Sequence, residues 1–292
     1  MTARKLRTFE EKITIFMNKF AWKEEDSPNL FRAKYPYVSD DEIAELFKLS
    51  KEIYAAAYTF VQPRFQRDRF VETVKAEARA DLAARYPYLE TDGIDQAVSS
   101  AFQKAWRASF FAEVMETFRF LETQYGYQSL KEEIEYPGDP RDTTMVIRYI
   151  GSQVGVAISW YPEGGSIRVS LVECLQPGIY PERATCWLIK DRSDLAKFID
   201  LSCLVEMQGQ SEDPDLLLKE DGDYRKVTRR SKLIYARMSD VIAGLARATQ
   251  TYAAPILQGD TTGFPQIMRY YALRYKRLHP TASLPLGLVD EE

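Results

Sequence analysis

Residues 145–171, MVIRYIGSQVGVAISWYPEGGSIRVSL, contain the pattern that decides the fold class. Bulky apolar residues alternate with small or polar ones over 154–160 and again over 167–171, which is typical of β-strands. Gly151–Ser152 predicts a two-residue hairpin loop of type II′, and the PEGG run at 162–165 predicts the next turn. We therefore expect an antiparallel meander with one face buried and the other partly exposed to solvent.

Shorter segments on both sides of the meander predict further elements. Residues 132–136 and 184–189 have strand-like composition. Ser193 is a favourable N-cap residue, so it predicts the start of a helix that carries Phe198 and Ile199.

Apolar residues at helical spacing predict three long helices around these strands, over 110–121, from about 225 to 252, and from 262 to 275. The expected result for residues 108–280 is an α+β domain in which an antiparallel sheet packs against long helices. The last residues, 281–292, are expected to form a flexible tail.

The first third of the chain contains an internal repeat. Residues 33–38, AKYPYV, recur as ARYPYL at 84–89. In each copy the proline biases the preceding tyrosine toward extended backbone and so ends a helix. After the first copy, Ser39 and Glu42 have the spacing of a capping box that starts the next helix.

The repeat predicts two copies of a unit made of a helix, a Tyr-Pro-Tyr corner and a second helix. Two copies are fewer than a solenoid needs, so we expect a helical bundle with a twofold internal repeat over residues 1–107. The corners are expected to be packed hinges, with a peptide-binding surface as the alternative.

Composition excludes several classes of protein. The 292 residues include 39 Lys and Arg against 43 Asp and Glu, so the net charge of −4 gives no overall attraction to nucleic acid. The sequence lacks an apolar run of the roughly 20 residues that a membrane span needs. Charged residues at 10–12 occupy the place of a signal-peptide core, so a cytoplasmic protein is expected.

The residues that most often carry chemistry are scarce. Cys174, Cys186 and Cys203 lack the close-paired spacing of a structural zinc site, and His279 is the single histidine. We expect reduced, buried thiols and a histidine at a helix C-terminus. Glycine-rich nucleotide-binding motifs are also absent. These observations favour a protein with no catalytic residues, no metal and no cofactor.

A basic segment is the main candidate binding feature of the sequence. It opens the helix predicted from about residue 225, where positive charge opposes the helix dipole. Either the acidic residues at 220–223 neutralise it, or it binds a protein or phosphate-bearing partner. A nucleic-acid adaptor role is an alternative that follows from the same segment. Its members are Arg225, Lys226, Arg229, Arg230 and Lys232.

A second alternative is a metal-dependent nuclease. Asp200, Glu206 and Gln208 resemble the PD-(D/E)xK fingerprint, in which acidic oxygens hold Mg²⁺ and a third group orients water. The Pro-Asp pair of that fingerprint does not precede them at the usual place.

The C-terminal part resembles a family. Residues 118–122, FRFLE, and 125–127, YGY, precede a short meander, and 256–260, ILQGD, follow it. This order is similar to that of uncharacterised bacterial α+β domains that include immunity-type proteins paired with polymorphic toxins, and the resemblance covers residues 108–278. It implies binding by surface complementarity, without catalytic residues.

The resemblance and the composition together indicate a function. We expect a non-catalytic protein–protein interaction protein of immunity or defence type, from a bacterial conflict or mobile-element system. Its expected partner is a toxin or a component of a larger complex. The 18 Tyr, 15 Phe and 4 Trp supply side chains of the kind that anchor such interfaces.

Overall fold

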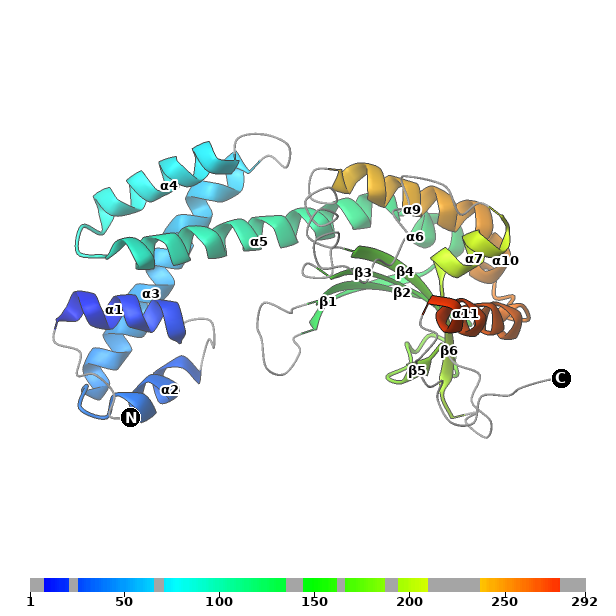
Figure 1. Ribbon diagram of the computed structural model, residues 1–292, viewed down its shortest axis with the longest axis horizontal. Coiled ribbons are helices and arrows are strands. Elements are labelled where there is room, and N and C mark those ends of the chain that lie inside the picture. Colours follow the sequence, from blue (N-terminus) through cyan, green and yellow to red (C-terminus); the bar gives the residue numbers. More distant parts are fainter. Residues whose placement is uncertain are drawn as a thin grey trace. The chain divides into compact units, whose positions relative to one another are not determined.

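The computed structural model describes residues 8–20, 26–65, 71–134, 144–161, 166–186, 194–209 and 237–278. The chain divides into two compact units, residues 1–110 and 111–292, whose elements are labelled in Figure 1. This division falls inside the continuous helix α5 (Thr91–Thr117), close to the boundary between residues 107 and 108 that the sequence predicts. Among the described residues, no helix combines the length and the apolarity that crossing a membrane requires.

The first unit is helical in all its described elements. These are α1 (Phe9–Lys19), α2 (Ser27–Lys34), α3 (Asp40–Val61), the 3-10 helix η2 (Gln62–Arg64), α4 (Val71–Arg85) and the first part of α5.

The capping residue predicted after the first corner is confirmed. The Ser39 hydroxyl accepts a hydrogen bond of 3.2 Å from the backbone N–H of Glu42, which fixes the start of α3. The Glu42 carboxylate does not complete the capping box. It instead pairs at 2.6 Å with the Lys12 ammonium group, and this pair ties α3 to α1.

The two Tyr-Pro-Tyr corners have the same local structure. The N–H of the first tyrosine in each corner closes the preceding helix with a 2.8 Å bond, to the carbonyl of Phe31 or of Leu82. The two tyrosine rings of each corner, at 35 and 37 and at 86 and 88, lie edge to face with centroids 6.2 Å apart. A twofold relation between the complete helical pairs stays a prediction.

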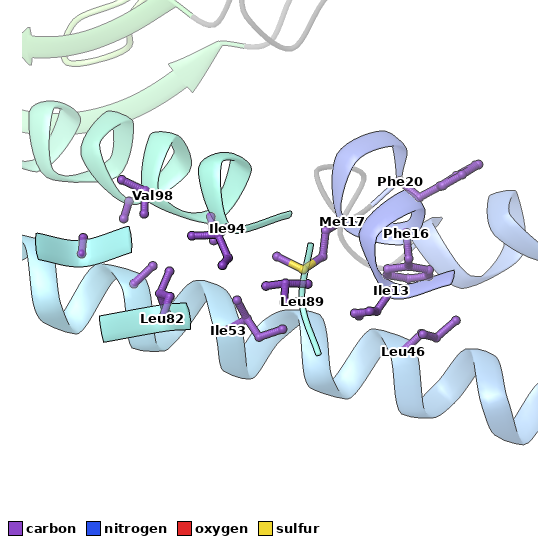
Figure 2. Close-up of a cluster of buried hydrophobic side chains, with 14 of the residues drawn as sticks. Ile13, Phe16, Met17, Phe20, Leu46, Ile53, Leu82, Leu89, Ile94 and Val98 are labelled. Atoms are coloured by element: carbon purple, nitrogen blue, oxygen red, sulfur yellow. The ribbon is translucent and has the colours of Figure 1, made fainter. Parts of the chain in front are cut away.

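The core of the helical unit forms around α3, as Figure 2 shows. Ile13 and Phe16 of α1 lie over Leu46 of α3, and side chains of α4 and α5 gather near Ile53 farther along the same helix. Phe16 also contacts Phe31 of α2, with ring centroids 5.2 Å apart. Removing these side chains from water is the main contribution that stabilises this unit.

The second unit contains a six-stranded sheet, which confirms the α+β fold and the antiparallel meander. The strand order is β1-β2-β3-β4-β6-β5, antiparallel except for the β5–β6 pair. The strands are β1 (Gln128–Ile134), β2 (Thr144–Ile150), β3 (Val154–Tyr161), β4 (Ser166–Glu173), β5 (Ala184–Thr185) and β6 (Ala196–Asp200).

Helices of the second unit cover this sheet. They are α6 (Phe120–Tyr125), α7 (Leu201–Met207), α9 (Met238–Tyr252), α10 (Ala254–Leu257) and α11 (Phe264–Leu278), together with the end of α5. Helices α7 and α9 contact β4, and α11 contacts β6 and α7 (Figure 1). Gly126 ends α6 in the left-handed conformation with φ 71°, and Pro255 follows the end of α9.

The helix predicted from Ser193 is wrong, because residues 196–200 form strand β6. Phe198 pairs with Val172 of β4, and this sheet pairing overrides the local preference for a helix. The helix begins later, at α7, where the Asp200 carboxylate accepts a 2.8 Å hydrogen bond from the Ser202 N–H. Residue 193 itself lies outside the described residues.

The β2–β3 hairpin also differs from the prediction. Its two loop residues are Ser152 and Gln153, because the Gly151 N–H donates to the Val154 carbonyl at 3.0 Å and so closes the turn. Gly151 is therefore not a loop residue, but a Cβ there would lie 2.7 Å from the Val154 carbonyl oxygen. A Cβ at this position would lie 2.8 Å from the Tyr127 ring.

Both faces of β3 are buried, although the alternating pattern predicts a second face that is partly exposed to solvent. The small residues Gly155, Ala157 and Ser159 line that face and are buried. Their size leaves room for other side chains, since the Tyr180 ring lies directly on Gly155.

Candidate functional site

The segment after β4 forms a β-turn closed by a hydrogen bond. Residues 176–179 are Gln-Pro-Gly-Ile, and Gly178 has a φ of 73°. Proline followed by a glycine with positive φ is the signature of a type II turn. The Ile179 N–H closes the turn with a 3.1 Å hydrogen bond to the Gln176 carbonyl.

Both ends of this turn are tied to the β2–β3 hairpin. On one side, the Cys174 N–H donates a 2.7 Å hydrogen bond to the Gln153 carbonyl. On the other side, two carbons of the Tyr180 ring lie 2.8 Å from where a Cβ on Gly155 would be. The Arg148 guanidinium lies over the same ring, 4.6 Å from its centroid. These contacts fix the turn against the sheet.

Two large aliphatic side chains are exposed on the turn. Leu175 is 50% exposed and Ile179 is 56% exposed. We refer to residues 175–179 as the apolar turn. A braced backbone that presents two aliphatic side chains to solvent suits binding to an apolar surface of another molecule.

The apolar turn is not among the sites that the sequence predicts. The available signal was a Pro-Gly pair placed between Leu175 and Ile179. That pair predicts a turn, but the exposure of the flanking side chains depends on the tertiary contact of Tyr180 with Gly155.

The predicted basic segment lies outside the described residues, which omit 210–236. The basic segment therefore stays a prediction from the sequence. Its members are Arg225, Lys226, Arg229, Arg230 and Lys232. His279 also lies outside the described part of the chain.

The residues of the alternative metal site are separated along α7. Asp200 caps the N-terminus of the helix and Gln208 is its C-cap, so their backbones lie about 12 Å apart along the axis. Glu206 is engaged by α11: its Oε1 lies 3.1 Å from Nη2 of Arg274, and its Oε2 accepts a 3.1 Å hydrogen bond from the Tyr270 hydroxyl. Within the described ranges, no group of three His, Cys, Asp or Glu side chains is placed to hold a metal ion.

The three cysteines are free thiols, and burial disfavours their ionisation. Burial raises the pKa of Cys203 to about 12, with a further increase from the nearby charge of Asp200. Burial also raises the pKa of Cys174 and of Cys186. Because the thiolate is the reactive form, these environments do not favour a cysteine nucleophile.

Comparisons with protein-family models, with curated proteins and with solved structures find no match to this chain.

Proposed function

We propose that the protein acts by binding another protein, without catalysis, through a surface that includes the apolar turn. The partner that the sequence resemblance favours is a toxin or a component of a larger complex, in a cytoplasmic immunity or defence role. The observation that carries the proposal is the exposure of Leu175 and Ile179 on a backbone held at both ends.

The number and placement of the two side chains support this proposal. Single exposed aliphatic residues are common on protein surfaces and need no explanation. Leu175 and Ile179 differ because they share one short turn, closed by the hydrogen bond from Ile179 to Gln176. A turn already in its bound conformation loses little conformational entropy on binding.

The expected contribution to affinity follows from the exposed area. Burying a Leu or Ile side chain completely contributes about 1.5–3 kcal/mol. Since Leu175 and Ile179 are each about half exposed, covering both contributes about 1.5–3 kcal/mol, or roughly 10- to 150-fold in Kd.

Site-specific photocrosslinking in the native cell tests this surface. A photoreactive amino acid replaces Ile179 in one strain and Leu273 of α11 in the control strain. Leu273 is a matched control because it is also an exposed aliphatic residue, at 66%. The proposal expects a discrete protein adduct from position 179 that is absent from position 273.

The captured partner is then purified and titrated against the full-length protein and its Leu175→Ser/Ile179→Ser variant. The expected result is a Kd that rises about tenfold or more in the variant, with unchanged stability. The absence of an adduct specific to position 179, or an unchanged Kd in the variant, would contradict the proposal.

A further inference from the structure

Strand β1 is an end strand of the sheet. Its neighbour on one side is β2, and within the described ranges no strand lies on its other side. Both of its faces reach solvent, because Gln128, Leu130 and Lys131 are exposed and Ser129 is partly exposed. An end strand leaves a row of backbone N–H and C=O groups without partners in the ladder.

Two hydrogen bonds at the β2–β3 hairpin set the bonding phase of the sheet. The Gly151 N–H donates to the Val154 carbonyl at 3.0 Å, so the odd-numbered residues of β2 bond to β3. The Cys174 N–H donates to the Gln153 carbonyl at 2.7 Å, so the odd-numbered residues of β3 bond to β4. The two bonds agree, since the even-numbered residues of β3 are then left to bond β2.

This phase decides which residues of β1 face the open edge. The even-numbered residues of β2 bond to β1, and their partners in β1 are also even-numbered. Ser129, Lys131 and Glu133 therefore direct their backbone N–H and C=O groups away from β2. None of the three forms a backbone hydrogen bond to another segment of the described chain. Successive outward groups lie about 6.8 Å apart, which is the repeat of an antiparallel strand.

Leu130 lies on the same sheet face as the contacts that brace the apolar turn. It is 46% exposed and pairs with Arg148 of β2. The Arg148 guanidinium lies over the ring of Tyr180, which directly follows the apolar turn. Strands β1 and β3 are about 10 Å apart, so a partner that covers the roughly 800 Å² of a standard interface reaches both features.

An extended segment of another protein is the occupant that suits the open edge. A strand offers backbone donors and acceptors at the same repeat as β1. A second copy of this chain fits less well, because two copies paired over the full length of β1 would place their Lys131 side chains opposite each other. Like charges directly opposite each other on neighbouring strands are destabilising.

The side chains of β1 indicate the chemistry of that segment. A strand added beside β1 places alternate side chains on opposite faces of the sheet. An acidic residue is favoured opposite the exposed Lys131, and an apolar residue is favoured on the other face, beside Leu130. The expected segment therefore alternates acidic and apolar residues.

We propose that the binding partner adds an extended segment of this kind to the open edge of β1, as an antiparallel strand. The inference rests on the proposed function, because it assigns the binding mode of the partner that contacts the apolar turn. Backbone hydrogen bonds to residues 129, 131 and 133 contribute affinity, and Leu130 enlarges the apolar contact. No covalent step is involved.

Amide hydrogen exchange of the full-length protein, resolved by residue with NMR, tests the open edge before a partner is added. The amides of residues 130 and 132 bond to β2 and are expected to exchange slowly. The amides of residues 131 and 133 are expected to exchange at least tenfold faster. Slow exchange at 131 and 133 in the free protein, from a covering segment or from pairing with a second copy, would overturn the proposal.

The protein captured by crosslinking at position 179 is then added at saturating concentration. The amides of residues 131 and 133 are expected to exchange at least tenfold more slowly in the complex. Unchanged exchange at both residues would overturn this proposal and leave the role of the apolar turn intact. The absence of an adduct at position 179 contradicts the proposed function, and this inference with it.

Two variants of one residue separate the backbone from the side chain. Lys131→Pro removes an N–H that faces the open edge and no bond of the ladder, so its stability in urea is expected to match that of Lys131→Ala. Its Kd for the captured protein is expected to be tenfold or more above that of Lys131→Ala. Leu130→Ser is expected to raise the Kd about three- to tenfold. Equal Kd values for the two folded Lys131 variants would overturn the proposal, and the exchange experiment decides it if Lys131→Pro fails to fold.

Discussion

Replacing Gly155 with alanine tests whether Tyr180 braces the apolar turn. The added Cβ would lie 2.8 Å from two carbons of the Tyr180 ring. Non-bonded carbons are at their optimum near 3.5–4.0 Å, so the ring must move by about 0.7 Å or more. Overpacking of this kind costs about 1–3 kcal/mol. We expect the free energy of unfolding to fall by that amount.

A double-mutant cycle separates this clash from the intrinsic effect of the substitution. In a Tyr180→Ala background the clash disappears, and alanine within a strand is favoured over glycine by about 0.5–1 kcal/mol. Gly155→Ala is therefore expected to destabilise the wild type and to stabilise the Tyr180→Ala variant. The resulting coupling energy is about 1.5–4 kcal/mol.

Urea unfolding of the four proteins, followed by tryptophan fluorescence, measures the coupling. Gly263→Ala is the matched control, because its Cβ would meet only Ile267 Cδ1 at the ordinary distance of 4.0 Å. Its effect is expected to stay within about 0.5 kcal/mol of neutral or to be slightly stabilising. Additive effects of Gly155→Ala and Tyr180→Ala would refute the contact as the brace of the turn.

Two further predictions concern the contact of α7 with α11. Glu206→Ala removes the carboxylate that pairs with the guanidinium of Arg274, whose side chain is only 12% exposed. We expect the free energy of unfolding, measured in urea, to fall by about 3–5 kcal/mol. The control is Glu52→Ala, which breaks an exposed pair and should lower the free energy of unfolding by less than about 1 kcal/mol. Equal losses would contradict the buried ion pair. Burial raises the pKa of Cys203 from its ordinary 9.0 to about 12 in the folded state. Between pH 9 and 12 the thiol is therefore ionised in the unfolded state but not in the folded state. The free energy of unfolding is expected to fall by about 1.4 kcal/mol per pH unit over this range. The stability of Cys203→Ala should lack this component, and parallel pH profiles of the variant and wild type would count against it.

The strands and corners were predictable because their signals are local. The alternation over 154–160 and the turn residues after it predict the central hairpins of the sheet without knowledge of any distant contact. The Tyr-Pro-Tyr corners were predictable for the same reason, since each proline acts on the residue before it.

Strand β6 shows where local patterns fail. Phe198 and Ile199 fit the apolar stripe of a helix as well as the face of a strand, and Ser193 is an acceptable N-cap. The segment forms a strand because Val172 and Leu171 of β4 pair with these two residues. A pattern confined to one segment contains no information about such a partner.

The apolar turn could not be predicted for the same reason, because its exposure depends on a contact between distant segments. The small residues at 155, 157 and 159 have the pattern of a strand face turned to solvent. That face is instead covered, at Gly155 by a tyrosine 25 residues later in the chain. Gly155 leaves room for the Tyr180 ring, and this ring fixes one end of the apolar turn. The fixed turn keeps the side chains of Leu175 and Ile179 exposed to solvent. If this chain of contacts is correct, Gly155→Ala should weaken partner binding although residue 155 is buried and does not touch the partner. A Gly155→Ala variant that binds the partner with wild-type affinity would show that the exposed side chains do not depend on the brace.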